Sequence, residues 1–258
     1  MNINNFVIDR VVRGTMLSST DKSILWSLNQ IQNPQLSMTS ETVDATDALG
    51  SKIMSFERAK EATFSGENAL FDLALLAAQA GTSKEAGGDG KKIVCPIFDV
   101  IDVAGTTITL SQTPLEDIAY IYVLNDDATI GTSYKKGVEA NATDFTQTGK
   151  TITLPTSVKS GQVFVTYEYE TEEAVQVVNK ANEFPKNGEF VLEILGADVC
   201  DPSTLVHAYL IFPNCKLSSS TDLTFETEMT MSFELTASQA YCDREKKLWK
   251  LVIPTPAA

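Results

Sequence analysis

One stretch near the carboxyl end, residues 223–236, constrains the fold more than any other feature of the sequence. Apolar side chains alternate along most of it with threonine, serine and glutamate. The apolar set is Leu223, Phe225, Met229, Met231, Phe233 and Leu235. Because successive side chains of a β-strand point to opposite faces, this alternation predicts a strand with one face in a core and the other in water. About thirteen residues would span about 43 Å, a length that suits a sheet continuing across subunits.

Two more strands are expected on either side of a polar turn in the first quarter of the chain. Residues 35–43 and 52–64 are rich in Thr, Ser, Met and Phe, and residues 44–50 have the composition of a turn. These segments predict a long hairpin. The residues ahead of it predict an arm and one strand, Ile24–Leu28, with Pro34 ending that piece.

A convincing helical period occurs in one segment, at about residues 66–80. Leu70, Leu73, Ala74 and Ala77 are spaced as i, i+3, i+4 and i+7, and Gly81 follows where a helix would end. This segment predicts the principal helix, packed against a sheet. It is apolar beyond this single stripe, which leaves open whether a neighbouring subunit or the chain itself covers the rest.

The middle of the chain begins with a flexible break, residues 82–90, and then becomes rich in β-branched residues. Within it, Gly105–Leu110 closely matches Gly149–Leu154 at an offset of 44 residues. Two similar hairpins would explain this echo, and so would chance similarity between exposed strands. A last strand is expected at residues 248–253, before Pro254.

Charge and composition weigh against several classes of protein. The formal net charge is −14, from 34 acidic and 20 basic residues, whereas proteins that hold nucleic acid tightly need a basic patch. No apolar run approaches the roughly 20 residues that span a bilayer, so no membrane partner is expected. The first residues do not resemble a signal peptide, which predicts synthesis in the cytoplasm.

No motif for catalysis, a cofactor or a metal is found. The single histidine, His207, lies in a strand-like apolar run without a nucleophile in a recognisable frame. Residues 125–131 fail as a calcium loop because Ala128 and Ile130 fall at ligand positions. The cysteines are scattered without a C-x-x-C pair, which predicts reduced thiols and no zinc site. They are Cys95, Cys200, Cys215 and Cys242. The chain is therefore not expected to be an enzyme.

The order of the segments carries a resemblance. A Ser/Thr-rich hairpin is followed by a helix, by β hairpins, by an alternating strand and by a closing strand. The segments concerned are Thr46–Gly50, Phe64–Asn68, Ala208–Asn214, Phe233–Leu235 and Leu248–Pro254. In this order the chain resembles the tail tube (major tail) proteins of long-tailed bacteriophages across most of its length.

The resemblance implies a mainly β fold: a β-sandwich with one flanking α-helix and an additional β-rich unit, forming a ring or tube through sheet edges. Residues 1–92 together with 172–258 would form the sandwich, and residues 93–171 the inserted or added unit. It also implies a virion protein of the tail that forms stacked, probably hexameric rings. The implied partners are further copies, other tail proteins and the genomic DNA, which passes through the tube without specific binding.

The resemblance also implies that acidic side chains line or approach the lumen, since carboxylates repel phosphate groups. The expected residues are Glu41, Asp44, Asp47, Glu57, Glu226, Glu228 and Glu234. A solvated outer face is the alternative for these acids. Alternation shows that a strand face is exposed to water, but not whether that face lies in the lumen or on the outside of the tube. Two other functions stay open: another virion component, such as a head decoration or tail terminator protein, and a carbohydrate-binding or enzymatic β domain.

Overall fold

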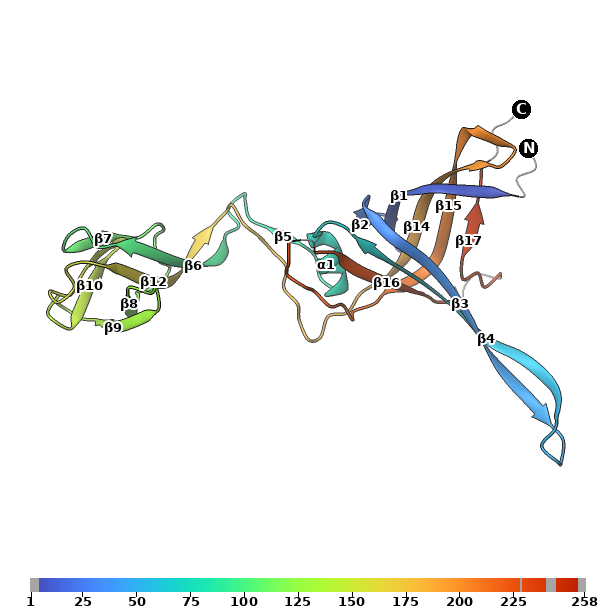
Figure 1. Cartoon of the computed structure of the whole chain (residues 1–258), viewed down its shortest axis with the longest axis horizontal. Coiled ribbons are helices and arrows are strands. Elements are labelled where there is room, and N and C mark those ends of the chain that lie inside the picture. Colours follow the sequence, from blue (N-terminus) through green and yellow to red (C-terminus); the bar gives the residue numbers. More distant parts are fainter. Residues whose placement is uncertain (1–4, 228, 240–244, 255–258) are drawn as a thin grey trace. The chain divides into compact units, whose positions relative to one another are not determined.

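A computed structural model describes residues 5–227, 229–239 and 245–254 of the chain (Figure 1). It is mainly β, as predicted, with seventeen strands and one helix in these residues. The chain forms two compact units. Unit 1 contains residues 1–84 and 177–258, and unit 2 contains residues 85–176.

Unit 1 is built on an eight-stranded antiparallel sheet with the order β2-β1-β14-β15-β16-β4-β3, in which β17 pairs with another part of β15. The first four strands are β1 (Phe6–Ser18), β2 (Ile24–Leu28), β3 (Ile31–Thr46) and β4 (Lys52–Asn68). The others are β14 (Asn187–Asp198), β15 (Asp201–Leu217), β16 (Met231–Ala237) and β17 (Lys250–Val252).

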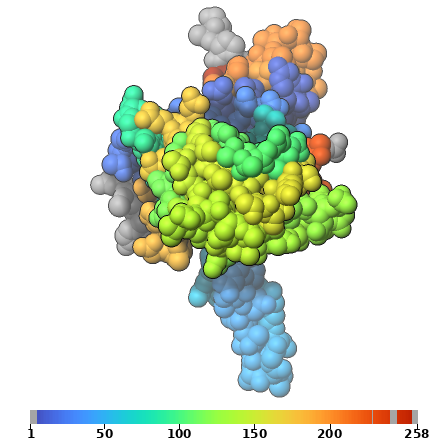
Figure 2. Space-filling view, turned by 90° about the vertical axis from the view of Figure 1, so that its left-hand side faces the viewer, coloured from blue at the N-terminus to red at the C-terminus, as the bar shows by residue number. Residues whose placement is uncertain are grey.

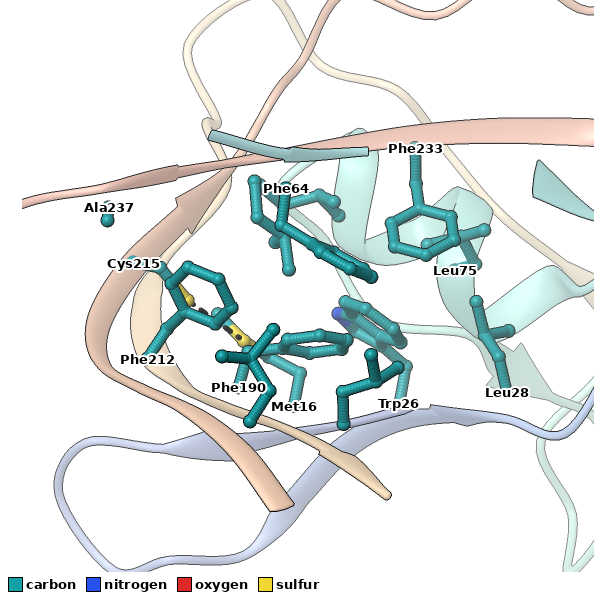
Figure 3. Close-up of a cluster of buried hydrophobic side chains, with 14 of the residues drawn as sticks. Met16, Trp26, Leu28, Phe64, Leu75, Phe190, Phe212, Cys215, Phe233 and Ala237 are labelled. Atoms are coloured by element: carbon teal, nitrogen blue, oxygen red, sulfur yellow. Dashed lines mark hydrogen bonds between the residues drawn. The ribbon is translucent and has the colours of Figure 1, made fainter. Parts of the chain in front are cut away.

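The sheet curls around one aromatic core, because strands from its two ends meet there (Figure 3). Trp26 on β2 lies 5.6 Å from Phe190 on β14 and 5.8 Å from Phe233 on β16, measured between ring centroids. Phe64 on β4 lies 5.4 Å from Phe190. Such ring pairs each stabilise a fold by about 0.5–1.5 kcal/mol beyond their burial. The fold thus confirms the predicted mainly β body with one helix, and its sheet is curved into a half-barrel.

The helix α1 (Leu73–Gln79) covers part of this core through Leu75, which is fully buried. Its amino end is capped by Asp72, whose carboxylate accepts a hydrogen bond of 2.7 Å from the Leu75 amide. At its carboxyl end Gly81 has a φ of +74°, and a Cβ there would lie 2.4 Å from the backbone of Phe184. A glycine is therefore required at this position, as the sequence indicated.

The helix is shorter than the predicted 66–80. Residues 66–68 complete β4 instead, where Gly66 pairs with Phe233 and Asn68 with Met231 of β16. Pairing with β16 extends β4 to Asn68, and the helix begins only after the Asp72 cap.

The strand predicted at 223–236 is also shorter, since only its second half is a strand, β16. Its neighbours limit it: β15 reaches only Leu235–Ala237, and β4 ends at Asn68, opposite Met231. Leu223 and Met229 still pack on the core without strand structure. The apolar period is therefore correct about burial for most of the set but wrong for Phe225, which is 79% exposed, and wrong about the backbone pairing of residues 223–230.

Two expectations for the first forty residues were wrong. The expected arm is the thirteen-residue strand β1, which pairs with β14 along its length. Pro34 does not end a segment but lies within β3, at a bulge between Gln32 and Gln35. Proline fits there because β3 is an edge strand, so the missing N–H removes no ladder hydrogen bond.

Unit 2 has a separate core and a seven-stranded sheet with the order β6-β12-β8-β9-β10-β11-β7. The strands are β6 (Ile93–Asp102), β7 (Thr107–Thr109), β8 (Tyr120–Leu124), β9 (Ile130–Lys136), β10 (Asp144–Thr148), β11 (Thr151–Thr153) and β12 (Gln162–Thr171). The short strands β5 (Glu85–Ala86) and β13 (Val175–Gln176) pair with each other at the two ends of this unit's sequence.

The two similar segments of unit 2 pair with each other. Ile108 on β7 lies opposite Ile152 on β11, and both are buried. The hydrogen bonds are reciprocal: the Leu110 amide donates to the Lys150 carbonyl and the Leu154 amide to the Thr106 carbonyl, each at 2.8 Å. The echo in the sequence therefore corresponds to a local two-fold arrangement of the backbone.

A buried carboxylate fastens the loop after β7 to the sheet of unit 2. Asp99 on β6 accepts hydrogen bonds from the Tyr167 hydroxyl at 2.7 Å and from the Ser111 amide and hydroxyl at 2.9 and 2.8 Å. Burial acts to raise the pKa of Asp99, but these three donors outweigh it and hold the pKa below its ordinary value. Burial is the main cause that raises the pKa of Tyr167 to about 12.

Candidate assembly surface

The hairpin of β3 and β4 extends beyond the core of unit 1 as a narrow arm (Figures 1 and 2). Every residue from Met38 to Glu61 is exposed. Strand β16 pairs with β4 only as far as Thr63, so within the described residues the outer part of the hairpin is a two-stranded ribbon without a third strand. Isolated two-stranded ribbons are marginally stable in water, so this arm lacks the support that other copies could supply.

At the base of the arm, β16, β4 and β3 present one continuous hydrophilic surface, which we call the polar sheet face. Residues opposite each other in an antiparallel sheet share a face, and the alternate residues here, including Phe64 and Phe233, fill the core. The polar sheet face contains Ser232, Glu234, Thr236, Glu61, Thr63, Ser65, Glu67, Gln32, Gln35, Ser37, Thr39, Glu41 and Arg58. One strand further, Lys216 lies opposite Thr236. The face therefore carries four carboxylates and one guanidinium among hydroxyl and amide groups.

Beyond this base the alternation changes, because a bulge inserts one extra residue into β4. Thr39 pairs with Glu61 but Glu41 pairs with Arg58, and Ala59 between them has a φ of +46°. A positive φ is strained for a residue with a Cβ. The bulge sets which side chains of the outer ribbon share a face.

The two faces of the outer ribbon differ in chemistry. One face carries Val43, Ala45, Met54 and Phe56, which lie opposite each other in pairs. The other face carries Asp44 and Glu57. The Lys52 ammonium lies 2.9 Å from the Asp44 carboxylate, and the Ser55 hydroxyl donates to it. The Ser55 hydrogen bond, and then Lys52, hold the pKa of Asp44 below its ordinary value.

The hairpin tip, residues 47–51, is an ordered turn. The Asp47 carboxylate accepts hydrogen bonds from the Leu49 amide at 2.9 Å and the Ser51 amide at 2.7 Å. The Asp47 amide donates to the Ser51 carbonyl, which closes the turn. Leu49 at its apex is 92% exposed.

A hollow of about 740 Å³ lies at the base of the arm, where β4 continues past the end of β16. We call it the basal pocket. Its apolar lining comes from Met38, Ala62, Leu248 and Trp249. Lys60, Glu61 and Lys246 contribute charged groups to its wall.

A comparison with protein-family models matches residues 6–247 to the YomU/Tube protein family. The chain belongs to this family. The match spans both units and confirms the resemblance to phage tail tube proteins, so the chain is a structural component of a phage virion. No curated protein matched the sequence.

The acids that the sequence predicts at the lumen lie on different faces and segments of the structure. Glu41 and Glu234 share the polar sheet face, whereas Asp44 and Glu57 lie on the opposite side of the ribbon. Asp47 orders the hairpin tip. Glu226 lies in the irregular segment ahead of β16, and Glu228 falls outside the described residues.

Sequence reasoning missed two acids of the polar sheet face, Glu61 and Glu67. Their signal was present in residues 61–68, where Glu, Thr, Ser and Glu alternate with Ala, Phe, Gly and Asn. Because the helical period predicts a helix from residue 66, it masks Glu67, the last acid of this alternation.

The groups with reactive side chains outside these surfaces include the single histidine and a buried cysteine. Nδ1 of the exposed His207 lies 2.9 Å from the carboxylate of the half-buried Glu193. Among the described residues, no group of three or more His, Cys, Asp or Glu side chains could hold a metal. In the same part of the chain, no helix is long and apolar enough to cross a membrane. Cys215 is a free thiol whose pKa burial raises to about 12.

Proposed function

We propose that this chain is the repeating subunit of a phage tail tube, assembled as stacked hexameric rings around a channel for the genome. The observation that carries the proposal is the unsupported arm. Its strand β3 has sixteen residues and forms the edge of the sheet, paired on one side only. A long open edge is a template for pairing with another chain, and a monomer would leave it unused.

The opposite end of the same sheet offers the complementary edge. Strand β2 pairs with β1 only over Gly14–Leu17, so residues 6–13 of β1 have β14 alone as a neighbour in the described part of the chain. Pairing of the β3 edge of one subunit with the β1 and β2 edge of the next would continue the sheet around a ring. Barrels remove open edges in this way.

The polar sheet face fits the wall of the channel. Its acids Glu61, Glu67 and Glu234 lie among hydroxyl and amide groups. A sixfold ring would repeat each carboxylate six times, and an anionic wall would repel DNA phosphates and keep the genome mobile. DNA would then pass without specific binding, and other tail proteins would contact the ends of the tube.

Electron microscopy of the purified protein tests the assembly directly. Rings with sixfold symmetry, or tubes built from them, are expected. A head decoration or tail terminator protein would instead give monomers or isolated caps, and that result would contradict the proposal.

The lumen assignment has its own test, which uses the two sides of β4 and its neighbours. Glu67→Lys and Glu234→Lys together should leave assembly intact and slow genome ejection, most strongly at low salt, where attraction to phosphate is least screened. Thr42→Lys with Glu57→Lys, two residues that lie opposite each other on the other side of the ribbon, is the matched control and should have a smaller effect. Equal ejection by this lumen-facing variant and the wild type at low salt would refute the assignment.

One observation favours an accessory binding role for unit 2. Phe98, Phe164 and Tyr122 lie side by side on the outer face of β6, β12 and β8, with ring centroids 6.1 and 6.4 Å apart. Phe98 is exposed. Aromatic surfaces of this kind can pack against the apolar faces of sugars, so we propose weak glycan binding here as a second function. Binding of glycans to the wild type but not to Phe98→Ala would support it.

A further inference from the structure

The hairpin tip has the properties of a preformed binding element. Asp47 fixes the backbone of the turn through two hydrogen bonds, and Leu49 projects from it almost fully exposed. An ordered apolar anchor loses little conformational entropy when it is buried, which favours its use at an interface. Nothing within the described chain covers this side chain.

The basal pocket has the complementary properties. Met38, Leu248 and Trp249 give it apolar walls, and its charged groups are two lysines, Lys60 and Lys246, against one glutamate. The segment from Asp44 to Lys52 around the tip carries two aspartates and one lysine. The pocket is thus net positive and the tip net negative, in a chain that is strongly acidic. Its volume of about 740 Å³ is sufficient for a leucine and part of its turn.

We propose that the hairpin tip of one copy docks in the basal pocket of another copy, with Leu49 as the anchor. Tip and pocket are different surfaces, so each subunit can give one contact and receive one. A contact of this head-to-tail kind produces an open chain of subunits unless rotation closes it.

The direction of the arm assigns this contact to successive rings. In a barrel, neighbouring subunits meet across the hydrogen-bonding direction of the strands, whereas the tip points along the strands. From Met38 to Thr46 the arm extends nine residues, or about 30 Å at 3.3 Å per residue. The tip therefore reaches beyond its own ring. This inference rests on the proposed ring, and it adds the contact that stacks the rings.

Two variants of the 258-residue chain test the tip and the pocket separately. Leu49→Asp removes the anchor, and Met38→Glu places a charge in the pocket wall at a side chain that is 63% exposed and outside the core. Each should weaken stacking by at least about tenfold, the effect of losing the burial of one leucine. Microscopy should then show single rings in place of tubes.

Matched controls come from unit 2. Val138→Asp changes a fully exposed apolar residue, and Ile130→Glu changes a strand residue that is 61% exposed. Both should assemble into tubes of wild-type length, which would show that an added charge alone does not prevent stacking.

A mixture of the two variants is the decisive measurement. Leu49→Asp rings keep working pockets and Met38→Glu rings keep working tips, so equal amounts should form two-ring particles and nothing longer. Tubes of normal length from either variant alone, or a mixture that stays as single rings, would overturn the inference while leaving the ring intact. A wild type that forms no rings would instead overturn the proposed function, and this inference with it.

Discussion

The two units of this chain differ in how the strands of each sheet pair through backbone hydrogen bonds. In unit 2 the longest strands, β6 and β12 with ten residues each, pair with each other along their whole length, and the similar segments 105–110 and 149–154 also pair with each other. In unit 1 the strands β3 and β4, of sixteen and seventeen residues, extend far beyond their neighbour β16, which has seven. The difference indicates a unit that folds around its own core and another whose sheet is completed by further copies.

The largest expected effect comes from removing the part of unit 1 that exceeds its own partners. Deletion of Asp44–Gly50 removes the turn and the end of β3, so polymerisation should be abolished. The core of unit 1 lies elsewhere, so the subunit should remain soluble and folded. Sedimentation would measure assembly and circular dichroism the fold. Tube formation by this deletion variant at the wild-type rate would contradict the view that the sheet of unit 1 is completed by further copies.

The next largest expected effect is a loss of stability confined to unit 2. Tyr167→Phe removes one of the three hydrogen bonds to the buried Asp99 carboxylate. This should lower the free energy of unfolding of unit 2 by about 1–3 kcal/mol, because a charged acceptor loses a donor. Tyr120→Phe, at an exposed site on β8, is the control and should change little. Ring assembly should be unaffected by both, and a loss of rings would show that the units are not independent in assembly.

The same hydrogen-bonded group predicts how unit 2 responds to pH. The pKa of Asp99 is lowered in the folded state, so its contribution is complete above the ordinary aspartate value and is lost as the pH falls through the lowered pKa. The pKa of Tyr167 is raised to about 12, so its contribution is present below pH 10 and is lost as the pH rises from there toward 12. Denaturant titrations of wild type and Asp99→Asn would measure the acid effect, which should be absent in the variant.

The smallest effect is expected from substitutions at the β4 bulge, which determines which side chains of the arm share a face. Ala59 has a φ of +46°, so Ala59→Gly should relieve strain of about 1 kcal/mol and increase hydrogen-exchange protection in the hairpin. Ala59→Val should have the opposite effect, since a β-branched residue fits this conformation poorly. Reduced protection in the glycine variant would mean that the added backbone freedom outweighs the relieved strain.

Local sequence patterns were sufficient to predict the strands that pair with segments nearby in the sequence. Ile24–Leu28 is a strand with the predicted bounds, and the hairpin on either side of residues 44–50 is present, with strands longer than expected. Alternation and turn composition identify such elements because both strands of a hairpin lie close together in the chain. The same reasoning correctly placed a glycine at the end of α1.

Other features depended on residues far apart in the sequence. Whether residues 66–68 continued a strand or began a helix was decided by β16, more than 160 residues later, and the length of β16 was decided in turn by β4 and β15. The sequence by itself determined that Glu41, Asp44, Glu57 and Glu234 are exposed to water. Only the tertiary structure decided which of them share a face, because one bulge at Ala59 shifts every later side chain of β4 to the other side.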